Sequence, residues 1–386
     1  MNSDMNRKGQ ATCATSRRDF IKAPLVAGAA GALLAADFSS QEQAGEKTTT
    51  QSTSGKREKV IGEYDPENLK IARRVSADIS DSDLLLLKQI GLRWAGVIFG
   101  TNGDLDFMHR AQMRFARFGI KIFAARHYAY RHLKIQLGQP GRDQYIEQYQ
   151  SYLRNLGKLG IPVSSYDFHP ANTYTTGQVK RRGYVAREFK LKDFREKIEK
   201  QRFDREYSAE EIWENYEYFM KAVLPVAEEA DVWLSLHPDD PPISKMNGVA
   251  KVFTHYNGYK RAEKIAAGSK HWGLELCVGT WLEGGDEMGK NVIEMIRDFG
   301  SRGKLLVIHF RNVSSPLPHF VETFHDDGYQ DMYLVMKALR EVRFNGLVIP
   351  DHIPQLAGDK GIRPIGTSYC ISYMRSLLRR ANQEVG

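Results

Sequence analysis

Four stretches of this 386-residue chain decide its fold: VWLSLH (232–237), LELC (274–277), KLLVIH (304–309) and LVIPD (347–351). Each is a short apolar run that ends in a side chain able to bind a metal, namely His237, Cys277, His309 and Asp351. These end residues lie 40, 32 and 42 positions apart, about one strand and one helix each. Short buried strands that repeat at this interval, with helical sequence between them, indicate a parallel α/β barrel.

A barrel of this kind requires eight strands, and eight candidate segments occur: LKIARRV (69–75), WAGVIF (94–99), KIFAAR (121–126), PVSSYDF (162–168), VWLSLH (232–237), LELCV (274–278), LLVIHF (305–310) and LVIPDH (347–352). Helical sequence lies between most of them. One such segment, residues 208–230, begins with Ser208 and Glu211 at capping-box spacing. We predict a (β/α)8 TIM barrel over residues 61–386. Its metal site should lie at the C-terminal ends of strands 5–8, where the catalytic residues of such barrels are found.

The segment between the fourth and fifth predicted strands is long, and its first part, residues 173–206, is strongly basic. Two interpretations are open. The segment is a solvated charged helix, or it is an insertion over the barrel mouth that acts as a lid and helps to hold an anionic substrate.

The composition fits a globular enzyme, with 42% hydrophobic and 26% charged residues. The net charge is +8, of which residues 1–36 carry five basic and two acidic side chains, so the remainder has about +5. This charge is mild, and no nucleic-acid recognition motif occurs, so we expect no nucleic-acid partner. A weakly basic enzyme suits a small anionic substrate.

The N-terminus indicates export. SRRDFIK (16–22) precedes the small and apolar run APLVAGAAGALLAA (23–36), which resembles a twin-arginine signal. The alternative is an ordinary basic N-terminus before a helix. We expect residues 1–36 to address the protein to the twin-arginine export machinery and the periplasm. Residues 37–60 are polar and rich in Ser, Thr and Gln, and are predicted to form a disordered linker.

Two cysteines follow the predicted signal, Cys277 and Cys370. In an oxidising compartment they could form a disulfide. The alternative, which the position of Cys277 at a strand end favours, is that its thiolate binds a metal.

Further site candidates surround the four strand ends. Asp239, in HPDDPP (237–242), is expected to orient His237 or to bind substrate, with a turn role as the alternative. Arg311 follows His309 by two positions and should lie on the same face, where it could bind a substrate carboxylate. A surface ion pair is its alternative role. His325, in ETFHDDG, is expected to enter the barrel mouth and bind substrate.

Two more residues are candidates for the site, and of these His352 could act as acid or base while its neighbour binds the metal. His352 is adjacent to Asp351, and Tyr369 lies 18 residues further along, after a glycine-containing loop. A set of two His, one Cys and one Asp leaves positions open on a metal with five or six ligands. The thiolate favours zinc, but an open site with a carboxylate is equally compatible with manganese.

At these residues the chain resembles the mannonate dehydratase family. The resemblance rests on motifs in the same order and spacing, among them HPDDPP (237–242), LELCVGT (274–280), IHFRN (308–312), ETFHDDGYQDMYLVMKAL (322–339) and PDH (350–352). It implies a (β/α)8 barrel and a metal held by His237, Cys277, His309 and Asp351. The implied metal is Mn²⁺, with Fe²⁺, Co²⁺ or Zn²⁺ as alternatives.

The resemblance also implies a reaction, the loss of water from D-mannonate to give 2-keto-3-deoxy-D-gluconate. Acid–base roles are implied for His352 and Tyr369. We assign Tyr369 as the base and His352 as the acid, and the reverse assignment stays open.

Three departures from the family affect positions that help to bind the sugar acid. The loop after the second predicted strand, FGTNGDLDF (99–107), lacks the family's pair of histidines. ANTYTTG (171–177) replaces an Asp-Trp-Thr-Arg stretch, and Ile349 stands where the family has arginine.

Three functions are therefore considered. The first is a metal-dependent dehydratase of mannonate or a related aldonate. The second is a metal-dependent sugar isomerase or epimerase on the same barrel, and the third is a periplasmic binding protein without activity. The expected partner is a small sugar acid or sugar, and a homo-oligomer is possible.

Overall fold

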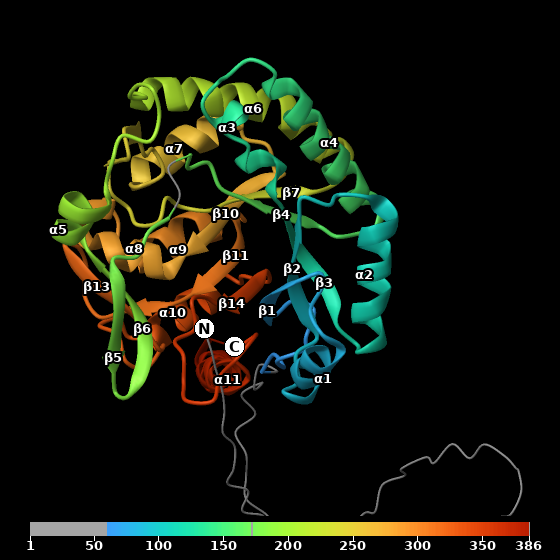
Figure 1. The fold of residues 1–386 in the computed structure, drawn as a ribbon. Coiled ribbons are helices and arrows are strands. Elements are labelled where there is room, and N and C mark those ends of the chain that lie inside the picture. The colour runs from blue at the N-terminus through green and yellow to red at the C-terminus, as the bar shows by residue number, and fades with distance from the viewer. Residues whose placement is uncertain (1–59, 171–172, 386) are drawn as a thin grey trace, which may run out of the picture. The chain divides into compact units, whose positions relative to one another are not determined.

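Eight parallel strands close into a barrel (Figure 1) in the computed structural model, which describes residues 60–170 and 173–385. The barrel strands are β1 (Lys70–Ser76), β2 (Trp94–Gly100), β3 (Lys121–His127), β4 (Val163–Tyr166), β7 (Trp233–Leu236), β10 (Trp272–Cys277), β11 (Leu305–Phe310) and β14 (Leu347–Pro350). They neighbour one another in this order, and β14 pairs with β1 to complete the closure. The predicted (β/α)8 barrel is confirmed, and each of the eight predicted segments overlaps one barrel strand.

Helices surround the barrel. The longer ones are α1 (Asp81–Gln89), α2 (Leu105–Arg117), α4 (Arg142–Lys158), α6 (Ala209–Glu229), α7 (Tyr256–Ile265), α9 (Val292–Ser301), α10 (Met332–Glu341) and α11 (Pro364–Val385). The predicted capping box of α6 is present, because the Ser208 hydroxyl accepts from the Glu211 N–H and the Glu211 carboxylate accepts from the Ser208 N–H. Shorter turns follow the strand ends: η1 (Tyr128–Arg131), α3 (Leu133–Gln136), α8 (Val278–Gly284) and η3 (Gly285–Met288).

The barrel interior is layered. Small and apolar side chains, including Ala72, Ala124 and Val307, form one buried cluster. Side chains two positions further along a strand lie on the same face, and on these three strands they are Arg74, Arg126 and His309. The interior therefore changes from apolar to charged towards the C-terminal ends of the strands.

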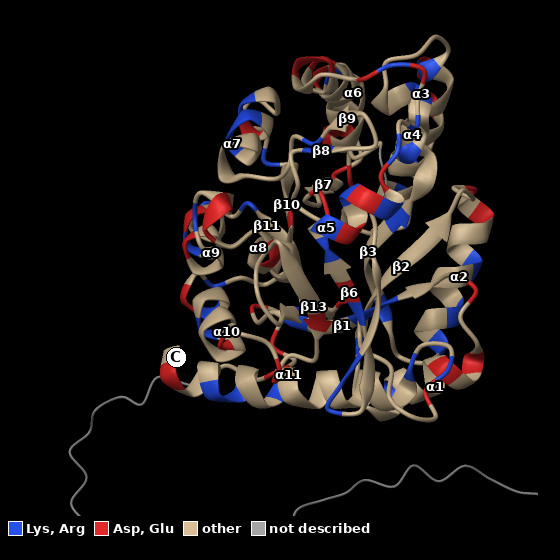
Figure 2. Cartoon of the chain, turned by 60° about the vertical axis from the view of Figure 1, so that its left-hand side comes forward, with Lys and Arg blue, Asp and Glu red and all other residues tan. Residues whose placement is uncertain are grey.

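The basic segment after β4 is a hairpin, so its interpretation as a charged helix is wrong. β5 (Gly177–Arg181) and β6 (Tyr184–Lys190) are joined by Arg182 and Gly183, both with positive φ, as a two-residue hairpin turn requires. Short helical turns follow, α5 (Leu191–Asp193) and η2 (Phe194–Ile198), where basic and acidic positions lie side by side (Figure 2).

This hairpin is fixed to two loops of the barrel mouth. β6 pairs with β13 (His319–Thr323), which in turn pairs with β12 (Asn312–Val313) just after β11. A single bridge joins Val185 to Gln355, in the loop after β14. A second small hairpin, β8 (Lys245–Met246) with β9 (Val249–Ala250), follows β7.

The predicted signal (1–36) and almost all of the predicted linker (37–60) lie outside the described residues, so both stay predictions. In the part of the chain that the structure describes, no helix combines the length and the apolar character needed to cross a bilayer.

Candidate metal centre and active site

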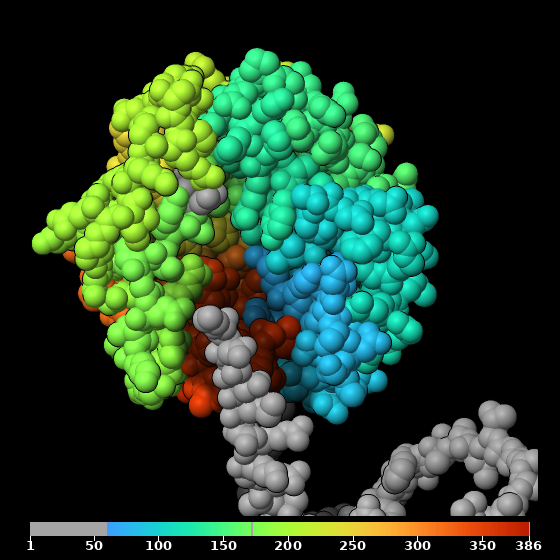
Figure 3. Space-filling model, in the orientation of Figure 1, coloured from blue at the N-terminus to red at the C-terminus, as the bar shows by residue number. Residues whose placement is uncertain are grey.

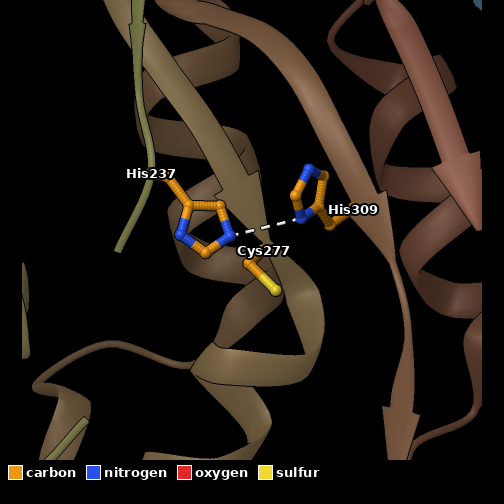
Figure 4. Close-up of side chains that lie close together, drawn as sticks. All are labelled: His237, Cys277 and His309. Carbon is orange, nitrogen blue, oxygen red and sulfur yellow. Dashed lines mark hydrogen bonds between the residues drawn. The ribbon is translucent and has the colours of Figure 1, made fainter. Parts of the chain in front are cut away.

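Three of the four predicted metal ligands meet at the C-terminal ends of neighbouring barrel strands. The imidazoles of His237 and His309 and the thiol of Cys277 place their ligand atoms within 4.8 Å of one another (Figure 4). His237 follows β7, Cys277 ends β10 and His309 lies in β11. Cys277 and His309 are register partners in the β10–β11 pair, so barrel closure itself brings them together.

Hydrogen bonds orient both imidazoles. His237 Nδ1 lies 2.7 Å from the Pro238 carbonyl oxygen, so it carries the proton and leaves Nε2 free. His309 Nε2 lies 2.7 Å from Glu275 Oε1, which leaves Nδ1 free. The two free nitrogens are 3.2 Å apart. Arg74 Nη1 is also 2.7 Å from His309 Nε2. A guanidinium can only donate, so Arg74 cannot accept the proton on His309 Nε2. We therefore assign this proton to the hydrogen bond with the Glu275 carboxylate.

Cys277 is buried and its environment favours the thiolate. Burial raises the pKa of this thiol, but Arg311 and the two imidazoles outweigh burial and hold it well below its usual value. Arg311 Nη2 lies 3.4 Å from the sulfur and the Thr280 N–H donates to it over 3.5 Å. Cys277 and Cys370 are both free thiols, so the disulfide interpretation is wrong.

Asp351 lies beside this group, one residue beyond β14. Its Oδ2 is 3.5 Å from His309 Nδ1 and 4.0 Å from Cys277 Sγ. Burial raises the pKa of the carboxyl, but His352 and His309 outweigh it, so the group stays ionised. Two imidazoles, a thiolate and a carboxylate are a donor set that suits a divalent transition metal.

Arg311 is fully buried, and its guanidinium is surrounded by carboxylates. It pairs with Asp240 Oδ2 over 2.9 Å, with Glu283 and with Glu322 Oε1 over 3.3 Å, and its Nε lies 3.4 Å from Asp351. These contacts occupy the edges that would bind a substrate carboxylate. They favour a positioning role for Arg311 over the predicted substrate contact, because the guanidinium contacts the predicted ligands Asp351 and Cys277 and is itself fixed by three other carboxylates.

Asp239 and His325 have other surroundings than expected. Asp239 forms a buried ion pair with Lys251 over 2.9 Å and accepts from the Phe253 N–H over 2.9 Å. The proton of the His237 ring goes to Pro238 instead, so the expectation that Asp239 orients this ring is wrong. The His325 ring packs edge-on against Phe310 at 5.1 Å between centroids, and burial lowers its pKa to about 4.

The two acid–base candidates are placed differently. His352 Nε2 lies 3.7 Å from Asp351 Oδ2, its Nδ1 lies 3.1 Å from Glu322 Oε1, and its backbone has a positive φ of 44°. Tyr369 is 40% exposed, and its hydroxyl donates to Asp326 Oδ2 over 2.6 Å. No contact among the described residues links Tyr369 to the metal ligands, so the structure brings together His352 and the ligands but not Tyr369.

The sequence-based interpretation missed a charged layer beneath the ligands. Glu275 is fully buried and contacts Arg126 over 2.7 Å, Arg74 over 3.0 Å and His309 over 2.7 Å. Asp167 lies 3.7 Å from Arg126 and accepts from Arg131. Glu275 and Arg74 could have been found from strand alternation, since Glu275 precedes Cys277 by two positions on an inward face. The space-filling view shows a hollow at the centre of the molecule, at the mouth of the barrel (Figure 3).

The chain is similar in sequence to proteins of one known family. Residues 111–185 and 185–384 match the family model described as D-mannonate dehydratase (UxuA), and the second match contains all four predicted metal ligands. Mannonate dehydratase 2 of Halalkalibacterium halodurans is 30% identical over 265 residues, which cover 60% of this chain and 73% of that protein. The mannonate dehydratase of Thermotoga neapolitana is 31% identical over 288 residues, covering 64% and 79%.

Solved structures agree. The mannonate dehydratase from Streptococcus suis serotype 2 superposes with a TM-score of 0.75 at 26% identity, covering 83% of this chain and 96% of that one. D-psicose 3-epimerase from Clostridium cellulolyticum H10 gives a TM-score of 0.53 at 12% identity, covering 80% and 99%, and shares only the fold. The family match spans most of the barrel and all four predicted metal ligands, and the chain belongs to the D-mannonate dehydratase family.

Proposed function

We propose that this protein is a metal-dependent sugar-acid dehydratase, a hydro-lyase that converts D-mannonate or a related aldonate to 2-keto-3-deoxy-D-gluconate and water. The observation that carries the proposal is the convergence of His237, Cys277, His309 and Asp351, with His352 adjacent, at the mouth of a barrel of this family. The substrate class follows from the names of the relatives. The geometry adds the side chains that can hold the metal and move a proton.

Loss of water breaks the C2–H and C3–O bonds of the substrate. A base takes the C2 proton, which is only weakly acidic beside a carboxylate, and an acid gives a proton to the departing C3 hydroxyl. The enol that remains becomes the 2-keto product by moving one proton to C3. A metal bound by the four ligands would stabilise the negative charge that develops on substrate oxygens.

His352 suits the acid step. Its Nδ1 lies 3.1 Å from Glu322 Oε1, and its Nε2 lies on the side of Asp351, 3.7 Å from Oδ2. Its side chain is 27% exposed, so a substrate in the mouth can reach it. Glu322 is in turn contacted by Arg311 and by Arg187 of the hairpin, so this support connects the catalytic ring to the proposed lid. Tyr369 as the base stays a prediction, because its hydroxyl is engaged by Asp326.

Mn²⁺ is the proposed metal, with Fe²⁺, Co²⁺ and Zn²⁺ as the alternatives. A single thiolate among nitrogen and oxygen donors is acceptable to all four ions. Reconstitution of metal-free protein with each ion in turn, followed by product analysis, ranks them.

The experiment that tests the function is product analysis. Metal-loaded full-length protein is incubated with a panel of aldonates and aldoses, beside His237→Ala and the matched control His109→Ala, a change at an exposed position of α2. A 2-keto-3-deoxy acid that is lost in His237→Ala and kept in His109→Ala supports the proposal. Isomerised sugar without loss of water selects the isomerase instead, and binding without turnover selects the binding protein.

Export through the twin-arginine pathway to the periplasm is proposed from the sequence of residues 16–36. Replacing Arg17 and Arg18 together with lysine should keep the protein inside the cell, and fractionation measures this directly. Equal periplasmic amounts of both forms would contradict the proposal. We also propose that the protein self-associates. Light scattering after size-exclusion chromatography measures its mass in solution.

A further inference from the structure

A polar pocket of about 340 Å³ opens between the loops that follow β3 and β4. Its described lining consists of Arg131, Leu133, Gln136, His169, Pro170 and Thr173. None of these residues is acidic. Because both loops leave the C-terminal ends of barrel strands, the pocket belongs to the same end of the barrel as the metal ligands. The mechanism proposed above does not use it.

Arg131 offers a free edge to this pocket. Its Nε donates to Asp167 over 3.0 Å, and Nη2 binds the same carboxylate. A guanidinium has five N–H groups. Both protons on Nη1 and one on Nη2 therefore remain, along the edge that fits a carboxylate in bidentate fashion. The Arg131 side chain is 39% exposed, whereas Asp167 behind it is almost fully buried.

His169 supplies the complementary acceptor. The residue is only 7% exposed, and its Nε2 lies 3.2 Å from Asp167 Oδ1. A carboxylate only accepts, so the proton of the neutral ring is on Nε2. Nδ1 is then an acceptor, and it has no hydrogen-bond partner among the described residues. A buried acceptor of this kind is satisfied when a ligand hydroxyl donates to it.

The pocket connects to the metal centre through two side chains. Arg126 lies 3.7 Å from Asp167 and 2.7 Å from Glu275, and Glu275 contacts His309 over 2.7 Å. One guanidinium and one carboxylate thus separate the floor of the pocket from a metal ligand.

We infer that this pocket receives an α-hydroxycarboxylate, the distal end of a dianionic sugar acid whose other end lies at the metal ligands, and that the protein binds this aldarate in addition to, and more tightly than, the aldonate of the proposed function. The distal carboxylate binds the free edge of Arg131, and its α-hydroxyl donates to His169 Nδ1. The hydroxyl of Thr173 and the amide of Gln136 line the remaining wall. This inference rests on the proposed function, because the metal end loses water as described above and gives a keto-deoxy aldarate.

The test compares two ligands that differ only at the distal end, D-mannarate and D-mannonate. Their binding to metal-loaded full-length protein is measured by titration calorimetry. The variants are Arg131→Gln, Arg131→Lys and His169→Leu, and the control is Arg110→Gln at an exposed position of α2. Wild type should bind D-mannarate at least about tenfold more tightly, the ratio expected for one bidentate charged contact.

Arg131→Gln should lose most of this preference while D-mannonate binding and the control stay unchanged. His169→Leu should weaken the binding of both ligands, because both carry the hydroxyl next to the distal carbon. Equal binding of the two ligands by wild type, or equal loss of both in Arg131→Gln, overturns the inference. Arg131 also supports buried Asp167, so thermal unfolding checks each variant. If Arg131→Gln does not fold, Arg131→Lys decides the result, because it keeps a cation beside Asp167 but removes the bidentate edge and should lose part of the preference. If the protein binds D-mannarate more tightly than D-mannonate but dehydrates neither, the proposed function is refuted, whereas the assignment of this pocket to a carboxylate still holds.

Discussion

Replacing Glu275 with glutamine tests whether the charged layer beneath the metal ligands holds the site. Glu275 is fully buried, and its Oε1 contacts Arg126, Arg74 and His309 within 3.0 Å. Burial raises the pKa of this carboxyl, but Arg74, Arg126 and His309 outweigh burial, so the group is ionised at neutral pH. Glutamine has nearly the same shape but no charge, and leaves two buried guanidiniums short of one counter-ion.

The size of the effect follows from these contacts. Breaking a buried ion pair by removing one partner lowers the free energy of unfolding by about 3–5 kcal/mol. Loss of the partner that orients a metal-bound imidazole reduces metal affinity by about 10–100-fold. Urea unfolding of metal-free protein at pH 7 measures the first quantity, and competition with a chromogenic chelator measures the second.

The matched control is Glu214→Gln, a change at an exposed position of α6, which should alter stability by less than about 0.5 kcal/mol. The stabilisation by Glu275 is present above the carboxyl's unfolded pKa of about 4.3 and is lost as the pH falls through its lower folded pKa. The difference between wild type and Glu275→Gln should therefore shrink below about pH 4. A variant as stable as Glu214→Gln, with unchanged metal affinity, would refute this account of the site.

Three more outcomes are expected. His325→Phe should make the free energy of unfolding less dependent on pH on the acid side. Burial lowers the pKa of His325 to about 4, so between pH 6.5 and pH 4 only the unfolded chain binds a proton at this residue. Over that range the wild type should lose on the order of 3 kcal/mol of unfolding free energy, and the variant should not. Urea midpoints at pH 7 and pH 4 measure this, and parallel curves for the two proteins would contradict it. Cys277→Ser should weaken metal binding by more than the roughly 10–100-fold expected for loss of an outer contact, and unchanged chelator competition would argue against thiolate ligation. His352→Gln and Tyr369→Phe should each lower kcat by about 10²–10⁴-fold, as expected for loss of the acid or of the base. An unchanged kcat in Tyr369→Phe would show that a group other than Tyr369, whose hydroxyl donates to Asp326, takes the proton.

The sequence was sufficient to predict that the four candidate ligands lie near one another, because their positions depend on local rules. A buried strand alternates its faces, so the residue at its C-terminal end is fixed within one position. Parallel pairing then brings the ends of neighbouring strands together, as Cys277 and His309 show. The same alternation gave the correct face for Arg311 but not its partners, because Asp240, Glu283 and Glu322 come from three separate segments, the loop after β7, helix α8 and strand β13.

Local sequence patterns did not predict the contacts of side chains whose possible partners lie far away in the chain. Tyr369 lies in a helix whose sequence does not show that its hydroxyl would meet Asp326, and Arg182 of the hairpin reaches the same carboxylate. The basic segment 173–206 became a hairpin because β13 offers β6 an edge to pair with, an edge that is invisible in the composition of the segment.

The sequence by itself therefore determined the barrel, its eight strands and the four ligand types at their ends, since each follows from periodicity and spacing along the chain. Only the tertiary structure decided that Glu275 and two arginines support His309, that Arg311 is enclosed by carboxylates, and that Arg131 and His169 share a pocket. The physical reason is that a charge buried in a barrel is stabilised by whichever opposite charges the closed sheet and its loops bring near it. Those contacts join residues that are often more than a hundred positions apart, as Arg126 and Glu275 are.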